Sequence, residues 1–146
     1  MKSLRHLTLA AALLAALAYV QVSAKNHVVP KAYMFGFSAS FNDSIVYFTD
    51  IQEVDSVWLT GKKNMLAGRG NYSYQLRNFF TNERDMPHRT CIVVSDVKLK
   101  NVEKKYNKMK KQYTGGKNAG KYDVRFLPAT EFKFTSVNMD DSDEKK

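Results

Sequence analysis

Three carboxylates near the end of an apolar run are the first side chains in this chain that could do chemistry. Asp50, Glu53 and Asp55 stand within six positions of one another, and clustered carboxylate oxygens are ligands that Ca²⁺ and Mg²⁺ prefer. The glycine turn and the ligand spacing of a cation-binding loop are absent around them. We therefore expect three solvated carboxylates at the end of a strand, with no metal and no cofactor.

A second constellation joins the only cysteine, Cys91, to His88, three positions earlier. A cysteine nucleophile needs a base, and the base needs a third group to orient it. The sequence places no such group beside the pair. Cys91 also lies inside the apolar run RTCIVVS (89–95), which is typical of a buried strand. We therefore expect a buried thiol that reacts slowly.

The alternative is that the protein is an enzyme, namely a small envelope hydrolase. Its site would lie near Asp50, Glu53 and Asp55, or near His88 and Arg89. The chain lacks GxSxG, P-loop, HExxH, CxxC and dinucleotide-binding motifs, which carry the local geometry that their chemistry needs. The sequence therefore favours a protein that binds over one that catalyses.

A lysine-rich segment at 98–121 is the strongest candidate for binding. It holds nine lysines and one acidic residue, Glu103, and such a field attracts phosphate-bearing polymers and anionic headgroups. It contains no arginine, the residue that favours bidentate contacts with nucleic acid, so we expect no nucleic-acid partner. An ordinary solvated helix face is the alternative interpretation of the same lysines. The candidate binding residues are Lys104, Lys105, Lys108, Lys111 and Trp58.

The elements that must position these residues follow from hydrophobic periodicity. Leu99, Val102, Tyr106, Met109 and Tyr113 recur three and four positions apart, which predicts an amphipathic helix with its lysines outward. Period-two alternation and β-branched runs predict the strands. The predicted elements are strands at 33–41, 45–51, 89–95, 122–127 and 131–134 and helices at 72–82 and 97–113.

This order, β-β-α-β-α-β-β, predicts an α+β domain. We expect a two-layer sandwich, a mixed sheet of about five strands with both helices on one face. Strands 89–95 and 122–127 flank a helix and should run parallel. The domain is expected to span 25–137, followed by a disordered acidic tail at 138–146.

The first 24 residues predict where the protein is located. Lys2 and Arg5 precede an apolar run over 7–20 and a small-residue site at 22–24, which is the pattern of a secretory signal peptide. The apolar run is shorter than the about 20 residues that span a bilayer. We therefore expect cleavage after Ala24 and a periplasmic or secreted product without a transmembrane segment.

Three stretches of the chain resemble a known group of proteins. They are YMFGFSASFNDSIVYFTDIQ (33–52), NYSYQLRNFF (71–80) and MPHRTCIVV (86–94). They resemble small exported proteins of unknown function from bacteria of the Bacteroidetes group, and this resemblance implies a Gram-negative envelope. The strand–helix–strand piece at 89–127 is also similar to peptidoglycan-binding domains of the SPOR type, although the element order differs.

The net charge, the signal-peptide pattern and the lack of catalytic motifs together favour one function. The chain carries a formal net charge of +9 at pH 7, which bears on its partners and not on its fold. We expect a small exported, non-enzymatic module that binds an envelope or extracellular macromolecule. An anionic polymer is the candidate ligand of its lysines.

Overall fold

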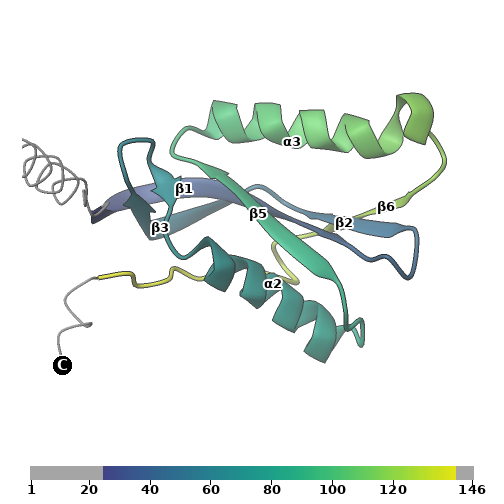
Figure 1. Cartoon of the computed structure of the whole chain (residues 1–146), viewed down its shortest axis with the longest axis horizontal. Coiled ribbons are helices and arrows are strands. Elements are labelled where there is room, and N and C mark those ends of the chain that lie inside the picture. Colours follow the sequence, from purple (N-terminus) through teal and green to yellow (C-terminus); the bar gives the residue numbers. More distant parts are fainter. Residues whose placement is uncertain (1–24, 141–146) are drawn as a thin grey trace, which may run out of the picture.

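The computed structural model describes residues 25–140, where a six-stranded mixed sheet lies between two helices (Figure 1). The elements in chain order are β1 (Asn26–Ala39), β2 (Ile45–Thr49), β3 (Gln52–Thr60), β4 (Met65–Leu66), α2 (Arg69–Glu83), β5 (Thr90–Asp96), α3 (Leu99–Thr114), the 3₁₀ turn η1 (Gly116–Asn118) and β6 (Asp123–Leu127). The predicted signal peptide at 1–24 and residues 141–146 of the predicted acidic tail lie outside the described residues. The α+β class and the mixed sheet are confirmed.

The central strand is β1, and it buries side chains on both faces of the sheet. Met34 belongs to one hydrophobic core and Phe35 to the other. Beside it, β2 and β3 form one bent antiparallel partner. Two pairs of opposed residues, Phe37–Phe48 and Met34–Gln52, define the register. Between these two pairs, β1 has two residues and the partner has three. The extra residue is a β-bulge, which bends the partner strand.

The remaining strands set the edges of the sheet. β5 pairs antiparallel with the second half of β1, and β6 pairs parallel with β2. β4 is a short antiparallel addition to β3. Because β1 runs opposite to both β2 and β5, the strands β5 and β6 run in the same direction. This confirms the predicted parallel relation, although β1 and β2 lie between them.

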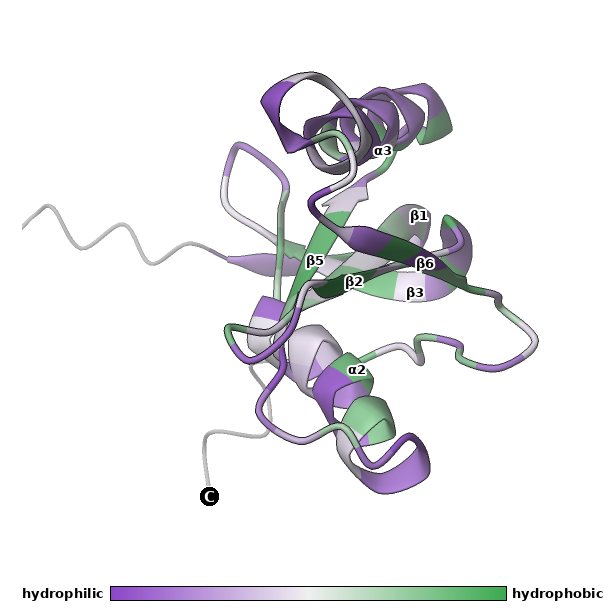
Figure 2. Cartoon of the chain, turned by 90° about the vertical axis from the view of Figure 1, so that its right-hand side faces the viewer, coloured by the Kyte–Doolittle hydropathy of each residue, from purple (hydrophilic) through white to green (hydrophobic). Residues whose placement is uncertain are grey.

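The two helices lie on opposite faces of the sheet, as Figures 1 and 2 show. α2 buries Tyr72 and Leu76 in the core that contains Met34. α3 buries Val102 in the core that contains Phe35. The prediction of both helices on one face is therefore wrong. The physical reason is that the central strand is apolar on both faces, so each face needs a cover.

A glycine makes room for the helix below the sheet. A Cβ at Gly36 would stand 2.5 Å from Leu76 Cδ2 and 3.0 Å from Phe134 Cζ, closer than atoms in a packed core approach one another. The Gly36 N–H donates to Thr49 Oγ1 at 2.8 Å, beside the bulge. This position therefore lets α2 and the C-terminal segment lie directly against β1.

The predicted last strand at 131–134 is an extended segment outside the sheet. Phe132 and Phe134 are buried as a strand would bury them. One side chain, Gln52, bonds to both residues: its Nε2 donates to Phe132 O at 3.0 Å, and Phe134 N–H donates to its Oε1 at 2.9 Å. A side-chain amide thus replaces the neighbouring strand that the alternation pattern implies.

The end of the described chain is also held against the domain. Gln75 repeats the arrangement of Gln52, because it both donates to Thr135 O and accepts from Thr135 N–H at 2.9 Å. Asn26 Nδ2 donates to Met139 O at 3.1 Å. Within residues 25–140, no helix has both the length and the apolar composition that crossing a membrane requires.

Candidate binding face of helix α3

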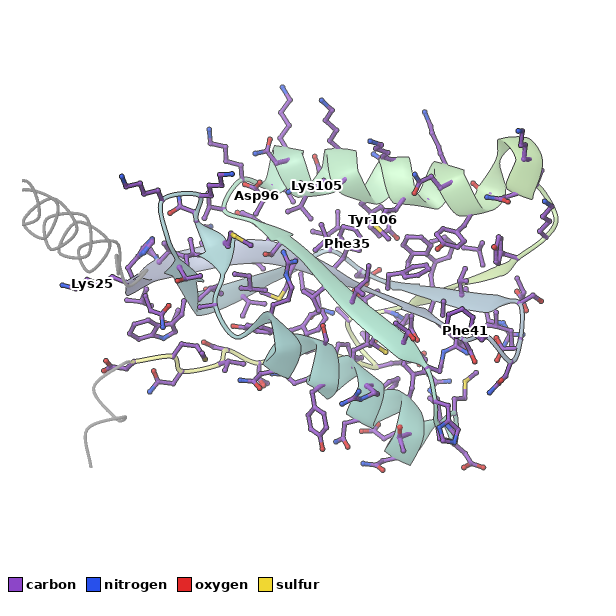
Figure 3. The ribbon with its side chains drawn as sticks, in the orientation of Figure 1. Lys25, Phe35, Phe41, Asp96, Lys105 and Tyr106 are labelled. Atoms are coloured by element: carbon purple, nitrogen blue, oxygen red, sulfur yellow. The ribbon has the colours of Figure 1, made fainter. Side chains whose placement is uncertain are left out.

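The orientation of α3 is set by its apolar stripe. Val102 is fully buried, and Tyr106 meets Phe35 edge-on with 5.0 Å between ring centroids. Tyr113 contacts Phe37 at 4.8 Å. Figure 3 shows Tyr106 pointing down from the helix towards Phe35. The predicted stripe is therefore confirmed from Val102 to Tyr113, whereas its first member, Leu99, is exposed. The opposite side of the helix is left to solvent.

Four lysines form one row along that solvent side, which we call the lysine row. Lys100, Lys104, Lys108 and Lys111 are all exposed. They are spaced four, four and three positions apart, so they stay on one side of the helix over about 17 Å. Figure 2 shows this side as strongly hydrophilic. None of the four has an acidic side chain within 4.0 Å among the described residues.

The predicted binding residue Lys105 does not belong to the lysine row. Its Nζ lies 3.5 Å from Asp96 Oδ2, beside the start of the helix (Figure 3). Burial works to raise the pKa of Asp96, but hydrogen bonds from the Lys98 N–H and Asn101, together with the Lys105 charge, hold it below its usual value. Lys105 therefore neutralises the carboxylate next to the beginning of α3.

The predicted binding residue Trp58 comes from a different part of the sheet. It lies half-buried on β3, opposite Val28 of β1, and its carbonyl oxygen accepts from Ala67 N–H at 2.9 Å. Among the described residues, no hydrogen bond or ring contact joins it to α3. The structure thus brings Lys104, Lys108 and Lys111 together and leaves Trp58 apart from them.

The three carboxylates of the alternative hydrolase site have different surroundings and do not form one cluster. Asp50 Oδ2 accepts from Ala129 N–H at 3.0 Å. Glu53 pairs with Lys31 at 3.2 Å. Asp55 is exposed on β3. Across residues 25–140, no three His, Cys, Asp or Glu side chains gather closely enough to hold a metal ion.

The most deeply buried charge of the described chain, Arg89, has a structural environment that the sequence did not indicate. Its side chain is 1% exposed. Its guanidinium donates to Ser38 Oγ at 2.9 Å, to Ile45 O at 2.6 Å and to Asp43 at 3.3 Å. The rings of Tyr47 and Phe80 flank it at 5.2 and 5.5 Å. Arg89 therefore ties the β1–β2 turn to the start of β5.

His88 and Cys91, which belong to the same segment, are more accessible than Arg89. His88 is exposed, in a left-handed backbone conformation with φ of 65°. Cys91 is half-buried, which corrects the expectation of a fully buried thiol, and its Sγ lies 3.5 Å from Ser38 Oγ. Burial raises the pKa of the thiol, and the charges of Arg89 and Arg77 oppose that shift in part.

This environment predicts how Cys91 reacts. We expect a thiol reagent to label the folded protein more slowly than the unfolded protein at neutral pH, because the raised pKa lowers the fraction of reactive thiolate. The rate should approach that of the unfolded chain only as the pH passes above the raised pKa of the folded thiol, which is higher than the usual value of about 8.5. Measured labelling rates that are equal in both states at neutral pH would contradict this.

Comparison with known proteins found no similar protein for this chain. No protein-family model matches the sequence, no curated protein matches it, and no solved structure matches its fold.

Proposed function

We propose that this protein is an exported, non-enzymatic binding module that holds a linear anionic polymer of the cell envelope or extracellular space along α3. The observation that carries the proposal is the lysine row, four exposed lysines on one side of the helix. Export rests on the signal-peptide pattern of residues 1–24.

The lysine row works against the stability of its own helix. Like charges four positions apart on a helix destabilise it by about 0.2–0.5 kcal/mol per pair. Lys98 and Lys100 also stand at the start of α3, where the helix dipole disfavours positive charge. The first turn holds no acidic residue, and among the described residues only Asp96, just before the helix, offers a carboxylate to this end. A surface shaped for stability alone would mix charges of both signs, which supports a role for the lysine row in binding.

The spacing of the lysine row suits an extended polyanion. Lysines four positions apart rise by about 6 Å along the helix, so successive ammonium groups can meet successive charges of a stretched polymer. A lysine ammonium is a point charge with rotatable donors. It accepts phosphate, sulfate or carboxylate groups without the planar geometry that arginine imposes. The proposed ligand class is therefore defined by its repeated charge.

The test compares two triple variants that lose the same charge. Lys104→Gln, Lys108→Gln and Lys111→Gln remove most of the lysine row. Lys25→Gln, Lys62→Gln and Lys133→Gln remove three exposed lysines elsewhere. The measurement is titration with a linear polyphosphate and with a polyuronate at about 0.15 M salt, where distant charges are screened.

We expect the first variant to bind at least about tenfold more weakly than wild type, because contacts between lysines and a polyanion carry much of the affinity. The second should bind nearly as well as wild type. Thermal unfolding of the first variant should be unchanged or slightly improved, because like-charge pairs are removed. Equal losses in both variants would show that total charge, and not the lysine row, causes binding, and would overturn the proposal.

A further inference from the structure

The outer edge of β5 is an open hydrogen-bonding edge. β5 pairs with β1 from Thr90 to Asp96, and no other strand in residues 25–140 pairs with it. Alternate residues of such a strand direct their N–H and C=O groups away from its partner. Natural edges are usually protected by lysine, proline or a bulge. The β5 sequence TCIVVSD has neither residue, and its register with β1 is unbroken.

The opposite edge of the sheet shows the contrast. It is formed by β4, which is two residues long, and by β6, which is five residues long and whose Arg125 and Asp123 side chains form an ion pair. Short length and charged side chains are the usual protections of an edge. Of the two edges, β5 is therefore the one that can accept another strand.

Two cavities lie along the β5 edge, one at each end of the strand. A cavity of about 400 Å³ is lined by Thr90 and Cys91 together with Tyr74 and Arg77 of α2. A cavity of about 250 Å³ is lined by Ser95 and Asp96 at the other end. Figure 1 shows β5 running between α3 and α2. An added strand would therefore find one cavity at each end of β5, the larger one between β5 and α2 and the smaller one among the end of β5, Arg69 of α2 and Lys105 of α3.

These cavities are predominantly basic. Lys63, Arg69 and Lys105 line the smaller one, and its single acidic residue, Asp96, is already bonded to Lys105. Arg77 lines the larger one, with its guanidinium 5.4 Å from the Tyr74 ring. Charge complementarity therefore selects an acidic occupant.

The edge also offers apolar contact area. Ile92 in the middle of β5 is 42% exposed, and Tyr74 of α2 is 56% exposed. Exposed apolar side chains beside an open edge favour a strand that alternates acidic and β-branched residues, because side chains alternate between the two faces.

We propose that β5 binds an extended acidic polypeptide segment, which adds to the sheet as a further strand. Its backbone pairs with the open edge, and its acidic side chains meet Arg77 and Arg69. The surface is separate from the lysine row of α3, so this inference does not depend on the proposed function.

The test uses a synthetic eight-residue peptide of alternating Glu and Val and two N-methylated isomers. One isomer is methylated on every Glu nitrogen and the other on every Val nitrogen, so each has one of its two hydrogen-bonding edges blocked. Affinity is measured at physiological salt with the full mature protein. Cys91 serves as the reporter of position, because it is the only cysteine and lines the larger cavity.

We expect the parent peptide to bind and to slow thiol labelling of Cys91. At least one methylated isomer should bind about tenfold more weakly, because strand addition needs main-chain hydrogen bonds on one edge. Arg77→Gln should weaken binding several-fold, whereas Arg125→Gln, an equal charge change at the β6 edge, should not. The lysine-row triple variant should bind the peptide as wild type does, which separates this result from the polymer test.

Three outcomes would overturn the proposal. Equal affinity of both methylated isomers and the parent would mean attraction by charge alone. Unchanged Cys91 labelling, or equal effects of Arg77→Gln and Arg125→Gln, would place the peptide elsewhere. A dimer seen by sedimentation without peptide, in which Cys91 is already protected, would show that a second copy of this chain occupies the edge.

Discussion

Replacing Arg89 with methionine is expected to lower the free energy of unfolding by about 2–4 kcal/mol, because buried hydrogen bonds are lost while Asp43, whose side chain is 35% exposed, keeps its solvation. Methionine keeps an apolar stem between Tyr47 and Phe80 but donates no hydrogen bond. Ser38 and the Ile45 carbonyl would lose their donor. A buried polar group without a partner costs about 1–3 kcal/mol, so several such losses account for the total.

The matched control for this prediction is Arg84→Met. Arg84 forms an ion pair with Glu131 and lies 5.5 Å from the Phe79 ring, but both charged side chains are exposed. Exposed ion pairs contribute about 0–1 kcal/mol, so the loss should stay in that range. Urea unfolding of both variants measures the difference. Similar losses would mean that the buried network around Arg89 contributes little to stability.

Replacing Gln52 with leucine is expected to lower the free energy of unfolding by about 2–4 kcal/mol, because two buried backbone groups lose their partners at once. These groups are the carbonyl of Phe132 and the N–H of Phe134. Leucine has a similar size, so the loss would come from hydrogen bonding and not from a cavity. The C-terminal segment, with its two buried rings, would then be held less firmly under the sheet.

Gln75→Leu is the control for the Gln52 prediction, because Gln75 makes the same two kinds of bond to Thr135. That pair of bonds is exposed, so water can replace the amide, and the loss should be at most about 1 kcal/mol. Urea unfolding again provides the comparison. If both variants lose the same stability, burial of the Gln52 bonds has no special effect.

The C-terminal segment also supports the surface around β5. It contacts the start of α2, where a Cβ at Gly68 would stand 2.9 Å from Met139 Sδ. The Tyr72 hydroxyl accepts from Val137 N–H at 3.1 Å. α2 supplies Arg69 and Arg77 to the β5 cavities. The segment therefore helps to hold both arginines beside the open edge.

Much of the local structure could be predicted from the sequence. The helix now labelled α3 and the strand labelled β5 lie within two residues of their predicted bounds. Periodicity specifies which side of an element is apolar, because side chains on a helix or strand repeat at fixed intervals. For the same reason, the sequence correctly placed Lys104, Lys108 and Lys111 on the outward side of α3.

Other features were decided by the tertiary structure, because they depend on residues far apart in the chain. Periodicity does not say which face of the sheet a helix covers, so both helices were expected on one face, whereas α2 and α3 cover opposite faces. Gln52 and Arg89 look like ordinary polar residues until the fold brings Phe132 and Ser38 to them. A buried polar group gains its role from its partner, and the chain near each of these residues does not contain that partner.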